Sequence, residues 1–253
     1  MKRTAVCLVA ACAAIAFVAR TSGDFLGSAQ NFGVLGGSTV TNTGASVING
    51  DLGLWPGTAV TGFPPGIVNG VQHINNGVAQ QAQADALTAY NVFAGMSFGQ
   101  NLSGMDLGGL TLTPGVYFFS SSAQLSAALT LDGLGDPNAL FVFQIASTLT
   151  TASASSILNI NGADGCNIYW QVGSAATLGT ETQFQGNILA NTSITLNTGA
   201  NILDGRAFAL NGAVTMDTNI INAGCVIPMP GATLLLAGAI GGRRNRASRR
   251  GVH

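Results

Sequence analysis

Residues 186–219 read GNILANTSITLNTGANILDGRAFALNGAVTMDTN, and within them a short motif occurs twice. The motif is a small or apolar residue, then Thr, then Leu or Met, then a small or polar residue. Four segments that share it are STLT (147–150), ATLG (176–179), ITLN (194–197) and VTMD (214–217). Its threonines, Thr148, Thr177, Thr195 and Thr215, are separated by 29, 18 and 20 residues. A period near twenty residues predicts a repeat architecture in which each repeat forms one coil.

Pairs of a polar residue and a glycine recur at the ends of the same cycles. They are Asn49-Gly50, Asn69-Gly70, Asp132-Gly133, Asn161-Gly162, Gln185-Gly186 and Asp204-Gly205. Glycine supplies the positive φ that such corners require. We therefore predict an all-β fold, a right-handed β-solenoid of short strands with Leu149, Leu178, Leu196 and Met216 stacked inside. The competing all-β fold is a β-sandwich, which requires longer strands joined by tight hairpins.

Residues 75–95, NNGVAQQAQADALTAYNVFAG, interrupt the repeat and are rich in Ala and Gln. Their apolar positions recur near helical spacing: Val78, Ala82, Ala86, Ala89, Tyr90 and Phe93. This pattern predicts one long amphipathic helix with a narrow face of small residues. Small side chains allow such a helix to lie close against the solenoid, which is a structural role.

Four stretches carry a resemblance to a known family: STVTNTGASVINGDLG (38–53), VTGFPPG (60–66), LTPGVYFF (112–119) and residues 186–219. They resemble the microbial ice-binding-like family of discontinuous β-solenoids, over about residues 28–225. The resemblance implies a three-faced, right-handed solenoid domain over residues 24–226 with the helix packed alongside. It also implies that the N-terminal strands join the stack beside coils that come much later in the chain. Some members bind ice through one flat face and others have no demonstrated role, so function has to be argued from the surface.

Both ends of the chain have the composition of processing segments. Residues 1–23 combine a basic start, an apolar run from Ala5 to Val18 and small residues after it, which is typical of a secretory signal peptide. A membrane anchor is the alternative, although fourteen apolar residues are short for a membrane span. The predicted location is therefore extracellular, either secreted or at the cell surface.

Residues 227–253 form the C-terminal segment, with Pro228-Met229-Pro230, an apolar run over 231–242 and an arginine cluster after it. This layout resembles the PEP-CTERM sorting signal, although the usual Pro-Glu-Pro is absent. The resemblance implies that a sorting protease and the membrane are partners during processing. A tail anchor or a basic disordered end is the alternative. In either case the arginine cluster is expected to lie at the anionic cytoplasmic surface of the membrane during processing.

The predicted mature chain retains two cysteines, Cys166 and Cys225. Outside the cytosol an even pair of cysteines favours a disulfide over two free thiols. Two isolated cysteines with no nearby His argue against a metal site, and no motif for a cofactor is present. We therefore predict a Cys166–Cys225 bridge and neither metal nor cofactor.

The charges argue against nucleic acid and against catalysis. Of nine basic residues, Arg206 alone lies in the central part of the chain, which holds all ten acidic residues, whereas phosphate binding requires clustered Lys and Arg. A glycosidase requires two carboxylates that converge on a cleft. Here Glu181 is the single Glu, His73 is the single His of the mature chain, and the Asp residues mostly occupy polar-Gly turns. We therefore predict that the protein is not an enzyme.

The threonines of the repeat point outward if the following Leu or Met residues point inward. We predict one outward column of Thr148, Thr177, Thr195 and Thr215, and a weaker second column of Thr150, Gly179, Asn197 and Asp217. Thr39 with Thr41, and Ala59 with Thr61, extend the face from the N-terminal coils. Outward Thr is also ordinary on any solvated β-face, because Thr has high β-propensity.

Ice presents an uncharged, flat and regular array of oxygens. Stacked strands repeat at ~4.7 Å and side chains two residues apart on a strand lie ~6.7 Å apart, close to repeats of the ice lattice. The stiff χ1 of Thr holds a methyl group beside a hydroxyl at little entropic cost. The predicted function is therefore ice binding through this face. The alternative is a non-catalytic structural or adhesive protein of the extracellular matrix, with exopolysaccharide as its partner.

Overall fold

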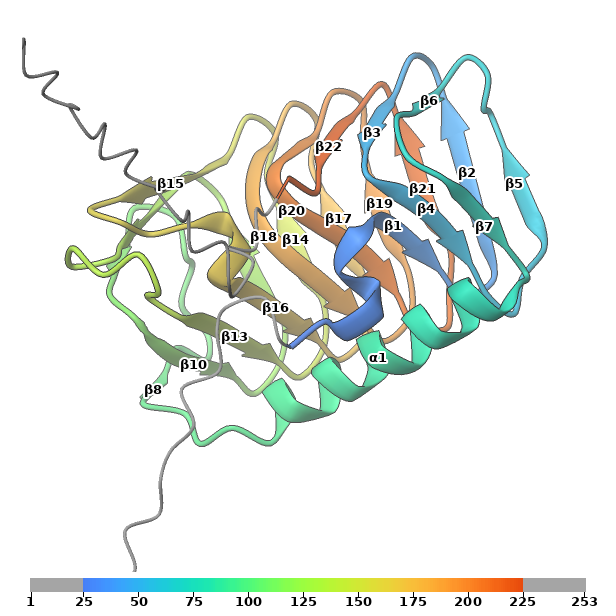
Figure 1. Ribbon diagram of the computed structural model, residues 1–253. Coiled ribbons are helices and arrows are strands. Elements are labelled where there is room, and N and C mark those ends of the chain that lie inside the picture. The colour runs from blue at the N-terminus through green and yellow to red at the C-terminus, as the bar shows by residue number, and fades with distance from the viewer. Residues whose placement is uncertain (1–24, 225–253) are drawn as a thin grey trace, which may run out of the picture.

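The computed structural model describes residues 25–224, and every strand pairing within that range is parallel. The chain winds as a solenoid with three faces (Figure 1). The strands of its stacked coils form a fifteen-stranded sheet and a seven-stranded sheet. Hairpin-linked sandwich sheets are antiparallel, so the sandwich alternative is wrong and the predicted β-solenoid is confirmed.

The seven-stranded sheet is one face of the solenoid, and we call it the threonine face. In spatial order its strands are β11 (Ala123–Leu125), β14 (Leu149–Thr151), β17 (Ala176–Leu178), β19 (Ile194–Leu196), β21 (Val214–Asp217), β2 (Thr39–Thr43) and β5 (Ala59–Thr61). None of its pairings contains a register shift. This regularity keeps outward side chains in straight columns.

The fifteen-stranded sheet bends over the two remaining faces. The helix face holds β8 (Gln100–Asn101), β10 (Gly115–Phe119), β13 (Phe141–Ile145), β16 (Ile168–Val172), β1 (Phe32–Gly36), β4 (Asp51–Leu54) and β7 (Gln72–Ile74). The third face holds β9 (Thr111–Leu112), β12 (Ala128–Asp132), β15 (Ser156–Ile160), β22 (Ile220–Asn222), β3 (Val47–Asn49) and β6 (Ile67–Val68). Two long strands, β18 (Gln183–Ala190) and β20 (Asn201–Ala209), contribute to both.

The two long strands turn the corner between the third face and the helix face at a pair of glycines. Gly186 and Gly205 are cross-strand partners there, and the register shifts just before them. Gly186 has φ +103°, and an added Cβ would lie 2.7 Å from Cγ2 of Ile168. The polar-Gly pairs of the sequence mark this corner because glycine tolerates both the backbone conformation and the close approach.

The order of the coils in space differs from their order along the chain. Strand β1 lies between β20 and β4, with Val34 opposite Ala207 and Leu35 opposite Phe208. The N-terminal coils therefore stack on the end of the last C-terminal coil, as the blue strands beside the orange ones show (Figure 1). The expectation of a discontinuous solenoid is confirmed.

Helix α1 (Gly77–Ala94) agrees with the helix predicted for residues 75–95. Its N-cap is Asn76, whose side-chain oxygen accepts a hydrogen bond from the backbone N–H of Ala79 at 3.0 Å. The inner face consists of alanines with Phe93 at the end, as expected, together with Gln83, but Val78 is 50% exposed and Ala79 is buried in its place. One residue rotates a helix by about 100°, so Ala79 rather than Val78 lies in line with Ala82 and Ala86.

The helix runs along the stack from the end at β7 to the end at β8 (Figure 1). Eighteen residues at 1.5 Å span ~27 Å, which returns the chain from the N-terminal coils to the far end of the solenoid. A second apolar core lies beneath it, to which the strands contribute Phe32, Leu35, Val142, Tyr169, Leu189 and Phe208. Helix packing therefore joins both parts of the discontinuous stack.

The interior of the solenoid is apolar and close-packed. Leu149, Leu178, Leu196 and Met216 are at most 1% exposed, so their inward orientation is confirmed. Aromatic rings fill the wider coils, with Phe143 and Trp170 stacked at a centroid distance of 3.9 Å. A filled interior resists deformation, so the strands of the threonine face lie on a rigid support.

Asp85 joins helix α1 to the 3₁₀ turn η1 (Gly27–Asn31). Its carboxylate accepts hydrogen bonds from Ser28 N at 2.8 Å and Ser28 Oγ at 2.6 Å. Burial alone would raise the pKa of Asp85, but the hydrogen bonds from Ser28 and Gln81 outweigh burial and lower the pKa below 3.8. A carboxyl group with a lowered pKa stabilises the fold above its unfolded pKa, and this contribution disappears as the pH falls through the folded pKa.

We expect Asp85→Asn to lower the Tm at pH 7 by about 2 °C, the shift for a loss of ~1 kcal/mol in a domain of this size. The difference from the unsubstituted protein should shrink as the pH falls below 3.8 and through the lowered folded pKa of Asp85. Thermal unfolding followed by circular dichroism at pH 7 and over a series of acidic pH values measures this. A difference that stays constant down to the lowest pH at which the protein is folded would show that the carboxylate charge is not responsible.

Three predictions fall outside residues 25–224: the signal peptide at 1–23, the sorting segment at 227–253, and Cys225 of the predicted bridge with Cys166. They stay predictions. Among the described residues, no helix is both long and apolar enough to cross a membrane.

Candidate functional site: the threonine face

One outward residue from the centre of each strand forms the principal column of the threonine face. The ladder places Gln124 beside Thr150, Thr150 beside Thr177, Thr177 beside Thr195 and Thr195 beside Thr215. It continues across the discontinuity, because Thr41 pairs with Thr215 and Thr61 pairs with Thr41. Six threonines from six strands therefore form one column, which spans ~24 Å at the usual strand spacing.

A second column lies two residues before the first. Its members are all Ser, Thr or Ala: Ser122, Thr148, Ala175, Ser193, Ala213, Thr39 and Ala59. Backbone hydrogen bonds keep these residues in register, from Ala123 N to Thr148 O, Leu149 N to Ala175 O, Ala176 N to Ser193 O and Ile194 N to Ala213 O. The Thr148 hydroxyl donates to Oγ of Ser122 at 2.8 Å. The face therefore carries two parallel columns of small, uncharged side chains, ~6.7 Å apart.

The register predicted for Thr148 is wrong. Its expected neighbour Thr177 pairs with Thr150, and Thr148 lies in the second column. The predicted second column is also displaced. Gly179, Asn197 and Asp217 come two residues after the central threonines, where the strands end, and Gly179 is buried. The alignment of the four Thr-Leu motifs placed Thr148 beside Thr177. It was wrong because the coils differ in loop length, so the same motif does not occupy the same position on each strand.

The N-terminal extension of the face agrees with the prediction. Thr39 and Thr41 lie opposite Ala59 and Thr61, in the same two columns. Both strands also share a sequence pattern, Ser, Thr or Ala two positions before the outward Thr. This pattern would have aligned the other strands of the face correctly. Applied to the remaining coils, it selects Thr148-x-Thr150, Ala175-x-Thr177, Ser193-x-Thr195 and Ala213-x-Thr215. Ser193 was missed because the motif was aligned on Thr-Leu instead, whereas Ser122 precedes Gln124 and neither pattern selects it.

The hydroxyl groups of the face are held by the framework beneath them. Oγ1 of Thr41 and Oγ1 of Thr215, from strands 174 residues apart, lie 3.4 Å from each other. The residues between the two columns are buried in the solenoid core, among them Val40, Ile194 and Val214. Thr has few rotamers on a strand, so a rigid backbone also fixes the positions of its methyl and hydroxyl groups.

Neither column contains a charged residue, and the nearest carboxylates lie at the margins. Asp217 ends β21, where its carboxylate accepts hydrogen bonds from the hydroxyls of Thr198, at 2.5 Å, and Thr218, at 3.0 Å. Asp106 pairs with Gln124 at the far end of the column. Burial alone would raise the pKa of Asp106, but hydrogen bonds from Gly108 and Ser126 lower it, so it stays ionised at neutral pH. Charged groups therefore lie at the edges of the threonine face and not within its two columns.

The one histidine of residues 25–224 lies away from the centre of the threonine face. His73 packs on Phe32, and its Nε2 lies 3.9 Å from Asp51 Oδ2, at the end of the stack beside β7. Within this range no group of three or more His, Cys, Asp or Glu residues is arranged to hold a metal ion. The regular threonine face is therefore the leading candidate for function.

The discontinuous parallel stack, the flanking helix and the uncharged two-column face define a class of protein, the β-solenoids that present one flat and regular polar surface. Within that class, this chain belongs to the Ice-binding-like family, whose model matches residues 34–222. An ice-binding protein of Nostoc sp. (strain HG1) is 62% identical over 224 residues, which cover 85% of this chain and 83% of the relative.

Solved structures agree with this assignment. The ice-binding protein from an Antarctic biological consortium superposes with a TM-score of 0.76 at 55% identity, covering 78% of this chain and 89% of that one. The ice-binding protein of the Antarctic ascomycete Antarctomyces psychrotrophicus gives a TM-score of 0.76 at 45% identity, with coverages of 78% and 97%.

Proposed function

We propose that this protein binds ice through the threonine face and acts outside the cell, either secreted or at the cell surface. The observation that carries the proposal is the uninterrupted column from Thr150 to Thr61, with a second column of Ser, Thr and Ala beside it. The naming of its relatives as ice-binding proteins supports the same conclusion.

The chemistry follows from the uncharged, repetitive surface. A charged side chain holds water in a strongly oriented shell that does not match a lattice, whereas a Thr hydroxyl exchanges hydrogen bonds with lattice oxygens and its methyl group fills the space between them. The ladder fixes these groups before contact, so little conformational entropy is lost on adsorption. We propose Thr150, Thr177, Thr195, Thr215, Thr41 and Thr61 as principal contacts, with Thr148, Thr39 and Ser193 beside them.

Incorporation into growing ice tests the proposal directly. A single ice crystal grown slowly from a dilute solution of fluorescently labelled protein should take up the label, because an adsorbed protein is overgrown. Bovine serum albumin carrying the same dye should be rejected into the liquid. The alternative of a matrix protein predicts rejection of both proteins, no thermal hysteresis and unshaped ice crystals.

We further propose that the protein is not an enzyme. Asp51 and His73 lie at an end of the stack, far along the coils from the centre of the threonine face. The proposed function uses the shape and regularity of a surface, and it requires no titrating group, metal or cofactor.

A further inference from the structure

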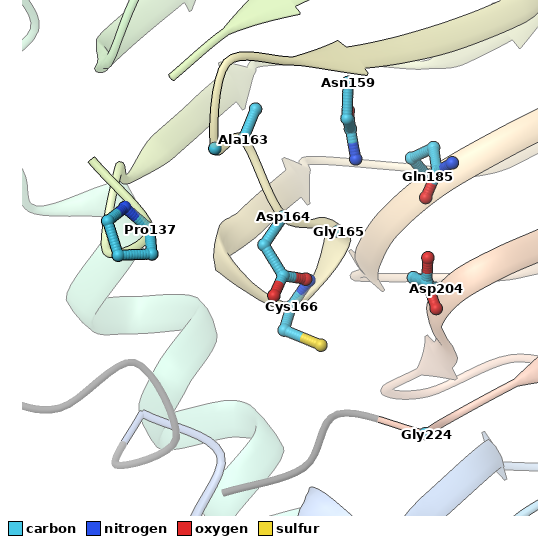
Figure 2. A pocket seen from close by; sticks show the side chains of 10 residues that line it. Pro137, Asn159, Ala163, Asp164, Gly165, Cys166, Gln185, Asp204 and Gly224 are labelled. Carbon is cyan, nitrogen blue, oxygen red and sulfur yellow. The ribbon is translucent and has the colours of Figure 1, made fainter. Parts of the chain in front are cut away.

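A hollow of about 450 Å³ opens between β15 and β18, where the third face loses its regularity. The two strands share only the pair Ser156–Gln183, and residues 161–167 then leave the sheet as a loop that ends in the 3₁₀ turn η2 (Gly165–Asn167). Figure 2 shows Asp164 on one side of the hollow, Gln185 and Asp204 on the other, and Asn159 above them.

The polar corner residues satisfy one another elsewhere along the stack. Asn161 donates to Oδ1 of Asp132 at 3.0 Å. At the N-terminal coils, Asn69 donates to Asn49 at 2.7 Å and Asn49 donates to Asn222 at 2.6 Å. Side-chain ladders of this kind arise because identical corners stack at the strand spacing.

This side-chain hydrogen bonding between neighbouring coils does not continue at the hollow. Oδ1 of Asn159 and Oε1 of Gln185 are buried, each with less than 1 Å² accessible, and neither has a hydrogen-bond partner. A buried acceptor without a donor has lost its hydration and gained no hydrogen bond in return, which destabilises the fold. Gln185 presents its unpaired oxygen to the hollow, so a positive or donating group is missing there.

Two carboxylates complete the wall. Asp164 caps η2 by accepting a hydrogen bond from Cys166 N at 2.9 Å through one oxygen. Asp204 is close by, since a Cβ added to Gly165 would lie 2.6 Å from Cβ of Asp204 and 3.0 Å from Oε1 of Gln185. Burial, and to a lesser degree the charge of Asp164, raise the pKa of Asp204. The hollow thus gathers oxygen acceptors whose charges repel one another.

We propose that a hard divalent cation, with Ca²⁺ as the preferred ion, binds in this hollow between the carboxylates of Asp164 and Asp204 and the amide oxygen of Gln185. Ca²⁺ takes carboxylate and amide oxygens in flexible geometry, whereas Mg²⁺ requires a near-ideal octahedron. The bound ion joins loop 161–167 to β18 and β20. The site lies away from the threonine face, so it is independent of ice binding.

Terbium luminescence tests this site, because Tb³⁺ replaces Ca²⁺ and emits when a nearby indole transfers energy to it. The indole Nε1 of Trp170 donates to the backbone oxygen of Gln185 at 3.0 Å, so an ion held by Gln185 lies beside this ring. Full-length protein titrated with Tb³⁺ should show emission excited through tryptophan that saturates at one ion per chain. Ca²⁺ should displace the Tb³⁺ at lower concentrations than Mg²⁺.

The variants locate the ion. Asp204→Asn removes one negative charge from the wall and should weaken Ca²⁺ binding by about tenfold or more, since ligand charge sets calcium affinity. Asp136→Asn removes the same charge from a neighbouring exposed loop and should leave affinity unchanged. Trp170→Phe should remove the sensitised emission while Ca²⁺ binding, measured by calorimetry, persists. Trp55→Phe should change neither.

Four outcomes would overturn the proposal. Calorimetry could show no Ca²⁺ binding at millimolar concentrations, Asp204→Asn could bind as tightly as the unsubstituted protein, or emission could survive Trp170→Phe. Equal weakening by Asp204→Asn and Asp136→Asn would show only diffuse attraction to an acidic surface.

Discussion

Thr195→Tyr is expected to abolish ice binding while the solenoid stays folded. Thr195 lies in the middle of the principal column, with Thr177 on one side and Thr215 on the other. A tyrosine ring there stands above the two columns and holds neighbouring threonines away from a flat lattice. Changes at the centre of a packed interface cost ~2 kcal/mol or more, which corresponds to at least about tenfold in affinity. Thermal hysteresis should therefore fall to the detection limit.

The matched control is Thr130→Tyr, since Thr130 is an outward threonine on strand β12 of the third face. It introduces the same ring on a β-strand and should leave thermal hysteresis unchanged. Circular dichroism and Tm of both variants should stay close to those of the unsubstituted protein. Full activity in Thr195→Tyr, or equal loss in both variants, would contradict the assignment of the threonine face.

Arg206→Met is expected to lower the free energy of unfolding by about 3 kcal/mol. Arg206 is 1% exposed. Its guanidinium donates to Gln30 O through Nε at 3.0 Å and Nη2 at 2.6 Å, to Asn187 Oδ1 at 2.8 Å and to Ala223 O at 3.2 Å. Methionine fills similar space without donors, and each buried acceptor left without a partner costs ~1–3 kcal/mol.

The position of Arg206 explains why the effect should be large. Its acceptors belong to the segment before β1, to β18 and to the segment after β22, so one side chain joins the N-terminal coils to the end of the C-terminal stack. Burial lowers the pKa of Arg206 to about 10, and it remains charged at neutral pH.

Urea denaturation measures the change, with Arg206→Lys as the second variant. Lysine keeps a charge but lacks the planar fork that serves several acceptors at once, so its loss should be intermediate. Hydrogen exchange should then show faster opening in β1 and β2 than in β17 and β19. A free energy of unfolding for Arg206→Met within about 0.5 kcal/mol of the unsubstituted protein, a change typical of surface substitutions, would contradict this role.

Much of this architecture follows from local patterns in the sequence. A Thr followed by Leu or Met alternates sides along a strand, so outward and inward residues follow once the segment is a strand. Leu149, Leu178, Leu196 and Met216 confirm this. The helix follows equally from its composition and spacing, although the exposure of Val78 shows that the inner face was misplaced by one residue at its start.

The sequence by itself determined the repeat, the inward and outward sides of each coil and the helix, because these depend on residues close together in the chain. Only the tertiary structure decided that Thr150, and not Thr148, stands beside Thr177, since loops of unequal length separate the strands and backbone hydrogen bonds set the register. It also decided the partners of Arg206 and the side chains that meet in the hollow. Gln30 and Arg206 lie 176 residues apart in the chain, and stacking of the coils brings them into contact.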